Sequence, residues 1–294
     1  MVLTTTEVIT VDGVNMKNLA RNIETLGATL RRASSRGANA PVASRAGRLW
    51  TPGKLRDEVV YNWPMWVVGA DEDDLIPGGS TDRKEFFKRV DELIALFSKR
   101  DRLLDIRHTL ADGSIRQMMC ESVSVLDFTT QGASPFAMVS VELVNPSGAA
   151  QDTADIVQSI LTTASLPITL DYTSFAGATE IMDDLVIAVT GPVTNVRLEA
   201  YRAGAALGVP VWVQYNGAIT GGQVLTINGI TGAVSGSGGL SPLLSNVVWS
   251  GTARFFHMVP RDALADPPQV RVTGTGASAA TAVQITGRRK YGTG

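Results

Sequence analysis

The chain has 294 residues, a formal net charge of −2 and a hydrophobic share of 44%. This apolar content can fill real cores, so it excludes a disordered or collagen-like chain, and the length predicts about two domains. No apolar run approaches the roughly 18 residues of a membrane span, and the first residues have neither the basic nor the apolar region of a secretory signal.

A basic segment comes first along the chain. Between Lys17 and Arg56 there are nine cations and one acid, Glu24. The stretch Ser34–Gly47 within it is rich in Ala, Ser, Gly and Asn, which favours a long arm or loop. Three roles stay open for this arm: a solvated loop, docking onto an acidic neighbouring subunit, or contact with phosphates. Because Trp50 is the only aromatic residue in the segment, we rank subunit docking above nucleic-acid binding.

The stretch Val59–Val68 is predicted to be a strand that carries many large side chains. Pro64 removes a hydrogen-bond donor from it, which requires an edge strand or a bulge. Trp66 falls on one face, and three bulky residues share the other face: Tyr61, Trp63 and Met65. Bulk on both faces of an edge strand is typical of burial against another protein, and a well-filled core corner explains it equally well.

One long helix is predicted over residues 82–100. The spacing of Asp82 and Glu85 is that of a capping box, and Lys99 and Arg100 lie at the negative end of the helix dipole. Between these ends apolar residues recur at helical spacing, namely Phe86, Val90, Leu93 and Phe97, backed by Phe87 and Ile94.

Further strand patterns follow this helix in the sequence. Residues 103–110 and 115–120 are separated by Asp112-Gly113, which predicts a β-hairpin. Residues 136–144 alternate between two faces, with one face formed by Ala137, Val139, Val141 and Leu143. The first domain is therefore expected to be α+β, with antiparallel strands around one long helix.

Composition separates the chain into two halves. Residues 1–150 hold 37 of the 54 Asp, Glu, Lys and Arg residues but 11 of the 29 glycines. Residues 151–294 hold the other 17 charges and 18 glycines, which is typical of a turn-rich all-β domain. About eight short strands predict a sandwich or jelly roll there. They cover residues 167–172, 184–190, 194–202, 209–215, 223–228, 247–258, 269–273 and 282–288.

A cluster of turn-forming residues at 145–153 marks the seam between the halves. A short amphipathic helix at about residues 153–161 is expected to bridge them. We therefore expect an N-terminal domain over residues 1–148, a linker with a short helix over 149–166, and a C-terminal β-sandwich over 167–294. The whole fold is predicted to be mainly β.

Patterns that would indicate catalysis or metal binding are mostly absent. His108 and His257 lie in strand patterns outside any catalytic or zinc motif, so we interpret both as surface or core histidines. Cys120 alternates with apolar neighbours and is interpreted as inert core. Asp183 and Asp184 are a poor carboxylate pair, because adjacent strand residues point to opposite faces. We expect no catalytic residue, no cofactor and no metal ion.

The order of these features resembles that of the distal tail proteins of long-tailed, siphovirus-type bacteriophages, often called minor tail proteins. The matching parts are the Gly-rich early loop, the approach Arg48–Gly53 to a strand at Val59–Gly69, the helix, and the hairpin with its return through Asp112–Arg116. The strand Phe136–Val144 then closes the domain, and a Pro-Ser-Gly linker leads to the sandwich. The resemblance covers nearly the whole chain.

In that family the N-terminal belt domain closes into a six-fold ring at the tip of the tail tube, and the C-terminal domain is a galectin-like sandwich. The resemblance implies a structural protein of the virion with no enzymatic activity, assembled in the host cytoplasm. Its hexameric ring would connect the tail tube to the baseplate and let DNA pass through the lumen. The implied partners are other copies of the chain, the tail-tube protein, the tape-measure protein and a tail-associated hub or baseplate protein, without membrane insertion.

Ring closure is expected to use a sheet edge or apolar strip of the belt domain, together with the basic arm. The strip would bury a surface that is otherwise prone to aggregate, and the arm would add charge pairs that set the register. The candidate interface residues are Arg31, Arg32, Arg36, Arg45, Tyr61, Trp63, Met65, Phe136 and Met138.

Other functions stay open. A carbohydrate-binding module used in host adsorption would need exposed rings in the second half, where Tyr201, Trp212, Tyr215 and Trp249 are available. The alternation there places Trp212 inward or at a rim. A major tail-tube subunit would also form a hexameric ring, although it usually has a single sandwich. A cell-wall hydrolase is the weakest alternative.

Overall fold

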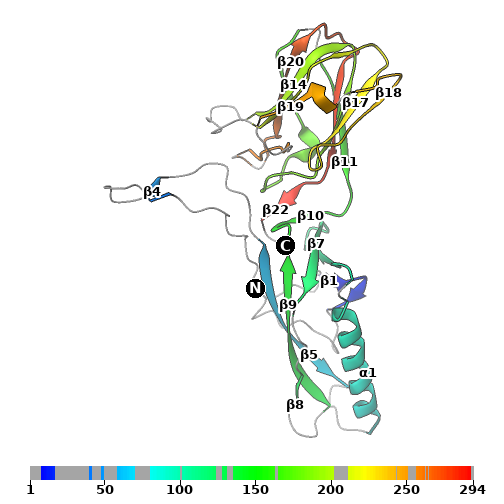
Figure 1. Cartoon of the computed structure of the whole chain (residues 1–294). Coiled ribbons are helices and arrows are strands. Elements are labelled where there is room, and N and C mark those ends of the chain that lie inside the picture. The colour runs from blue at the N-terminus through cyan, green and yellow to red at the C-terminus, as the bar shows by residue number, and fades with distance from the viewer. Residues whose placement is uncertain are drawn as a thin grey trace. The chain divides into compact units, whose positions relative to one another are not determined.

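The chain is described here from a computed structural model, which divides into two compact units (Figure 1). Unit 1 comprises Met1–Gly37, Lys54–Thr153 and Gly292–Gly294, and unit 2 comprises Ala38–Gly53 and Ala154–Tyr291. Placement is described for residues 8–16, 40–41, 48–49, 58–69, 80–99, 101–123, 128–130, 135–162, 165–201, 211–242, 244–250, 256–261, 263 and 265–292. Within these residues the fold is mainly β with one α-helix, which confirms the predicted fold class.

Unit 1 is an antiparallel sheet assembly with a helix beside it. Its strands are β1 (Val8–Val11), β2 (Val14–Asn15), β5 (Val59–Val68), β6 (Leu104–Thr109), β7 (Ile115–Ser122), β8 (Thr129–Thr130), β9 (Phe136–Asn145) and β10 (Ala150–Asp152). The spatial order is β2-β1-β6-β7-β10, and β9 pairs with β7, β8 and β5. The predicted hairpin is present as β6 and β7, with Leu104 opposite Cys120 and Thr109 opposite Ile115.

Strands β5 and β9 pair in register over ten residues, from Val59 opposite Asn145 to Val68 opposite Phe136. Among the described residues β9 is the only partner of β5, so Pro64 lies on an edge strand without a register shift. This confirms the predicted edge position. The predicted alternation of β9 is also confirmed, because one face is buried and its opposite carries the exposed Met138.

Helix α1 spans Ser80–Phe97 and contacts β5. Its buried side chains include Phe86, Leu93 and Phe97, as the helical spacing predicted. Phe87 and Ile94, which were expected to back this apolar face, are instead 53% and 39% exposed. They are seven positions apart, about two helical turns, so both lie on the same outward face of the helix.

The turn between β1 and β2 is held by an acid that sequence analysis did not single out. Asp12 and Gly13 have φ values of 50° and 82°, the left-handed geometry of a tight hairpin turn. The Asp12 carboxylate accepts hydrogen bonds from Lys99 Nζ at 2.8 Å, from Arg102 at 2.7 Å and from the Asp105 backbone N–H at 3.0 Å. Asp12 therefore ties this turn to the chain segment that follows α1.

Replacement of Asp12 by asparagine should destabilise unit 1 by about 1–2 kcal/mol, since two charge-assisted hydrogen bonds are weakened at a partly solvated site. Desolvation raises the pKa of Asp12, but hydrogen bonds from Lys99, Asp105 and Arg102 outweigh it and lower the pKa below 3.8. The stabilisation is thus present above pH 3.8 and is lost as the pH falls through the folded-state pKa. Urea unfolding between pH 2 and 7 should show wild-type and Asp12→Asn converging only at the acid end.

Unit 2 is a sandwich of two antiparallel sheets (Figure 1). One sheet has the order β11-β21-β13-β17-β18, with strands Ile156–Leu161, Ala282–Gly287, Val186–Thr190, Val224–Asn228 and Val234–Ser237. The other has the order β12-β20-β14-β15-β19, with strands Ile168–Asp171, Gln269–Thr275, Val193–Tyr201, Trp212–Tyr215 and Val247–Trp249. Strand β16 (Ala218–Ile219) also pairs with β14.

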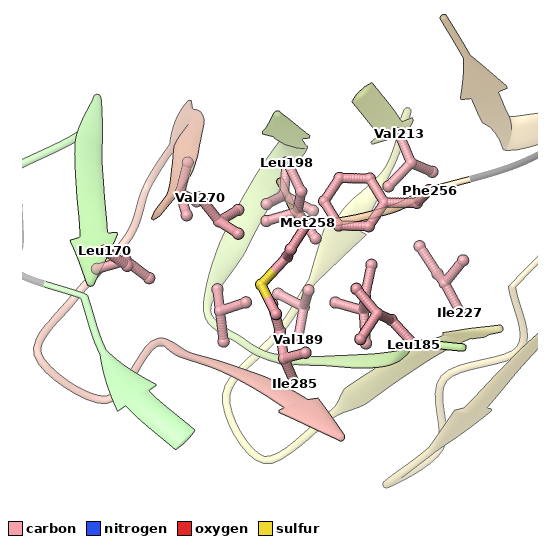
Figure 2. Close-up of a cluster of buried hydrophobic side chains, with 14 of the residues drawn as sticks. Leu170, Leu185, Val189, Leu198, Val213, Ile227, Phe256, Met258, Val270 and Ile285 are labelled. Atoms are coloured by element: carbon pink, nitrogen blue, oxygen red, sulfur yellow. The ribbon is translucent and has the colours of Figure 1, made fainter. Parts of the chain in front are cut away.

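Shorter elements complete unit 2. Strands β3 (Ala40–Pro41) and β4 (Arg48–Leu49) pair with each other, and β22 (Lys290–Tyr291) is the last strand. Two 3-10 turns, η1 and η2, span Thr173–Phe175 and Leu244–Asn246. Figure 2 shows the core between the sheets, where Leu185, Leu198, Met258 and Ile285 point toward one another.

The predicted linker helix at residues 153–161 is wrong. The segment forms strand β11, whose six residues pair with Ala282–Gly287 of β21. Ile156 and Ile160 fit helical spacing, but they also fit the alternation of a strand, and β-branched residues favour the pleated surface. Pairing across six residues decides between the two. Strands were also missed at 218–219, 234–237 and 290–291, where the apolar signal is short.

No helix in the described part of the chain combines the length and the apolar character needed to cross a membrane. Helix α1, at 18 residues, carries charged side chains along most of its length.

Candidate assembly surfaces

The outward face of β5 and β9 carries an apolar patch at one end. Trp66 lies opposite Met138, and Val68 lies opposite Phe136. Met138 is 43% exposed, and the other three side chains are half-buried. We call these four residues the ribbon patch. Beyond it the same face becomes polar, since the Ser140 hydroxyl donates a hydrogen bond to Asn62.

A second apolar patch lies on α1 and consists of Phe87 and Ile94, which we call the helix patch. The Phe87 ring contacts the buried Phe86 ring edge-on, with centroids 5.4 Å apart. This contact anchors an exposed ring to the core and limits its motion. Arg89 of the same helix donates a hydrogen bond to the Val68 carbonyl at 2.7 Å, which fixes α1 against the end of β5. Unit 1 thus presents two different apolar patches, one on a helix and one on a sheet.

Three of the candidate interface residues lie in the core. Tyr61, Trp63 and Met65 are only 3%, 5% and 1% exposed in the single chain. Burial raises the pKa of Tyr61 to about 12, as expected for a phenol removed from water. Their strand face is covered from within the chain, so the core-corner interpretation replaces the interface interpretation. The opposite face, which carries Trp66, is the one left open.

The other candidates divide into two groups. Phe136 and Met138 lie on the outward face as the alternation predicted, and both belong to the ribbon patch. The four arginines of the basic arm lie outside the described residues, namely Arg31, Arg32, Arg36 and Arg45. The helix patch was missed because its residues were assigned to the buried stripe. A helical wheel drawn with the observed bounds of α1 places Phe87 and Ile94 on a different side of the helix from Phe86 and Leu93.

A cluster of one buried lysine and two partly exposed carboxylates lies at the C-terminal end of unit 2. Lys290 Nζ contacts both Asp183 and Asp184, with the Asp184 carboxylate at 3.0 Å, and the lysine side chain is 4% exposed. The two carboxylates were expected to point to opposite faces. They converge because strand β13 begins only at Val186, which leaves residues 183–185 irregular. The cluster is an ion pair that anchors β22.

The side chains considered for nucleophilic chemistry are buried. Cys120 is fully buried, and desolvation raises the pKa of its thiol to about 12, so almost no thiolate exists near neutral pH. His108 is 5% exposed in β6. The position of Cys120 confirms its interpretation as core, and His108, expected at the surface or in the core, lies in the core. Among the described residues no group of three or more His, Cys, Asp or Glu side chains could hold a metal ion.

His257 gives unit 2 a specific pH dependence. Desolvation lowers its pKa to about 4 although Asp183 acts in the opposite direction. Well above pH 6.5 the imidazole is neutral in both the folded and the unfolded state. Between pH 6.5 and 4 His257 binds a proton in the unfolded chain but stays neutral in the folded chain. The free energy of unfolding should therefore fall by up to about 3 kcal/mol across this window. Urea unfolding should show this slope in wild-type protein and lose it in a His257→Gln variant.

A solved phage protein shares this fold. The chain superposes on the Dit protein of phage SPP1 with a TM-score of 0.50 and 12% sequence identity, over 96% of this chain and 98% of the Dit chain. That protein is described as a paradigm of the hub adsorption apparatus in phages that infect Gram-positive bacteria. Two structures of the phage P2 baseplate in its activated conformation each match with a TM-score of 0.33 and 7% sequence identity. The match to the structure with Ca covers 98% of this chain and 98% of that chain, and the match to the structure with Sr covers 95% and 97%.

The likeness to SPP1 Dit confirms, at the level of the fold, the resemblance predicted from the order of elements. It extends over both units of the chain. No protein-family model and no curated protein matches the sequence.

Proposed function

We propose that this chain is a structural subunit of a phage tail tip. Copies of it would join into a ring, with six copies as the resemblance implies, between the tail tube and the baseplate, and DNA would pass through the lumen. The observation that carries the proposal is the pair of different apolar patches on unit 1, in a chain whose fold matches SPP1 Dit over 96% of its length.

Two different patches suit a ring better than a simple dimer. A two-fold dimer uses one self-complementary surface on both partners, whereas a head-to-tail contact joins two different surfaces and closes into a ring when the rotation permits. The helix patch of one copy would pack on the ribbon patch of the next. Phe87 and Met138, each about half exposed, would supply the central contacts. Burial of such apolar side chains is the main driving force of stable association.

The edge strand β5 is protected from a competing mode of assembly. Among the described residues one edge of β5 has no strand partner and could template strand addition by another chain, but Pro64 in the middle of β5 carries no N–H donor. Contact through side-chain faces is therefore favoured over edge-to-edge pairing. This property suits a subunit that must form closed particles of one size.

The remaining partners follow from the proposed position. The tail-tube protein would contact one side of the ring, and the tape-measure and hub proteins the other, in a virion assembled in the host cytoplasm. The proposal assigns the chain no catalytic role. Among the described residues, the burial of Cys120 and the ion pairing of Asp183 and Asp184 with Lys290 are consistent with a purely structural role.

Mass photometry of the purified full-length protein, with negative-stain imaging, tests this function. The expected result is a species of one defined multiple of 31.2 kDa that images as short rings. Long tubes of open length would identify a tube subunit instead and contradict the tip assignment. A monomer at all concentrations, absent from purified particles of a phage that encodes it, would also contradict it.

A further inference from the structure

The two sheets of unit 2 have outward faces of opposite chemical character. On the sheet that contains β13 and β21, the outward residues are Val186, Ala188 and Thr190 on one strand and Ala282, Gln284 and Thr286 on the other, and none is ionisable. The other sheet, with β20, β14 and β15 side by side, carries charged, amide and aromatic groups on its outward face. Figure 1 shows β14, β19 and β20 together on one side of this unit.

The register of that second sheet arranges its outward side chains in two rows. Arg271, Glu199 and Trp212 lie opposite one another in the first row. In the second row Thr273, Arg197 and Gln214 do the same. Val213 and Tyr215 point into the core, so the half-buried Trp212 lies on the outward side. Of the two positions expected for Trp212, inward or at a rim, the inward one is wrong.

Trp212 is held in place by its neighbours. The Arg197 guanidinium carbon lies 4.2 Å from the ring centroid, and Arg197 also pairs with Glu199 at 3.5 Å. The Trp212 backbone N–H donates to the Ser250 hydroxyl at 3.1 Å. A ring fixed in this way loses little conformational entropy when a ligand stacks on it.

Planar polar groups beside the ring are also preset. Gln214 Nε2 donates a hydrogen bond to Asn216 Oδ1 at 2.6 Å, which orients both amides. Each amide retains an unused group: the Gln214 side-chain oxygen can accept, and the Asn216 amino group can donate. Together with Arg197 and Glu199 the face offers both donors and acceptors around one aromatic ring.

We propose that this face, centred on Trp212, is a binding site for a neutral saccharide. A pyranose ring has an apolar C–H face, which stacks on an indole, and a rim of hydroxyl groups that each need a donor or an acceptor. The face of the Trp212 indole that Arg197 does not cover would take the apolar face of the sugar, and Glu199, Gln214 and Asn216 would hydrogen-bond the hydroxyls. Arg197 acts as a positioning residue that holds the ring.

Other ligand classes fit this face less well. Glu199 lies between two arginines, and Asp171 accepts a hydrogen bond from Gln269 on the same face, so the carboxylates oppose phosphate binding. The centre of a protein interface is depleted of charge, whereas here charged side chains surround the ring. Within this face the only strongly exposed aliphatic residue described is Val248, at 40%. The inference does not depend on ring formation by unit 1.

Calorimetric titration of the full-length protein tests the site with four probes, the tetrasaccharides of glucose, galactose, mannose and N-acetylglucosamine. Wild-type protein should bind at least one of them saturably. Trp212→Ala should weaken that binding about tenfold or more, and Trp212→Phe, which keeps a ring, should weaken it less. Gln284→Ala, at an outward position of the opposite sheet, is the matched control and should bind as wild type does.

Gln214→Ala provides a second variant that leaves the aromatic ring in place, and it should also weaken binding several-fold. Absence of saturable binding to all four probes would overturn the proposal. Binding that is unchanged in both Trp212→Ala and Gln214→Ala would overturn it as well. Mass photometry of the same samples separates this result from the proposed function, because all four variants should assemble as wild type does.

Discussion

A Phe87→Asp variant and a Met138→Asp variant should each remain monomeric, and an equimolar mixture of the two should form dimers. The first variant loses its helix patch and keeps its ribbon patch, and the second has the reverse. In the mixture one intact pair of patches remains, which allows a single contact and no further growth. A buried charge facing an apolar surface should weaken each contact on the order of 100-fold or more. Mass photometry of the three samples measures the outcome.

The control for this experiment is Lys88→Asp, which introduces the same charge at an exposed polar position next to the helix patch. It should assemble as wild type does. Dimers formed by either single variant alone would show that like patches pair with each other, and would contradict the head-to-tail arrangement. A mixture that stays monomeric would show that the helix patch and the ribbon patch do not contact each other.

A Trp63→Ala variant should lower the free energy of unfolding of unit 1 by about 3–5 kcal/mol, because it leaves a large cavity in a well-packed core. Trp63 is 5% exposed and lies opposite Val141, which is fully buried. The loss should be seen in urea unfolding at concentrations where the chain is monomeric. Assembly should fail only as a consequence of this lost stability.

Trp66→Ala on the opposite face of the same strand is the matched comparison. Trp66 is half-buried in the ribbon patch, so its removal should cost unit 1 much less stability and should weaken assembly more. The reverse outcome, with Trp63→Ala stable and assembly-deficient, would restore Trp63 to the interface and contradict its assignment to the core.

Local patterns predicted much of the fold from the sequence. The predicted bounds of β5 agree with the observed Val59–Val68, because β-branched and aromatic residues cluster there and Pro64 marks an edge. The sequence placed helix α1 two residues too late at its start and three residues too late at its end, because element boundaries are the least certain part of such a prediction. The β6–β7 hairpin was found from the Asp-Gly turn between its strands.

The rest depended on contacts between distant parts of the chain. Strand β11 fits two periodicities, and only its pairing with β21 makes it a strand. Asp12 becomes a structural residue through Lys99 and Arg102, about ninety positions away, which no local pattern reveals. The helix patch was missed, and Trp63 was wrongly assigned to the interface, for a similar reason: burial of Trp63 and exposure of Phe87 depend on which face the remaining chain covers.

The central claim is that copies of this chain join through two different apolar patches. It is tested most directly by a Phe87→Cys/Met138→Cys double variant, oxidised after assembly and analysed under denaturing, non-reducing conditions. Cys120 is fully buried and should not interfere. The account predicts disulfide-linked chains in a ladder that ends at the mass of the closed ring. Chains that remain unlinked in fully assembled particles would contradict it.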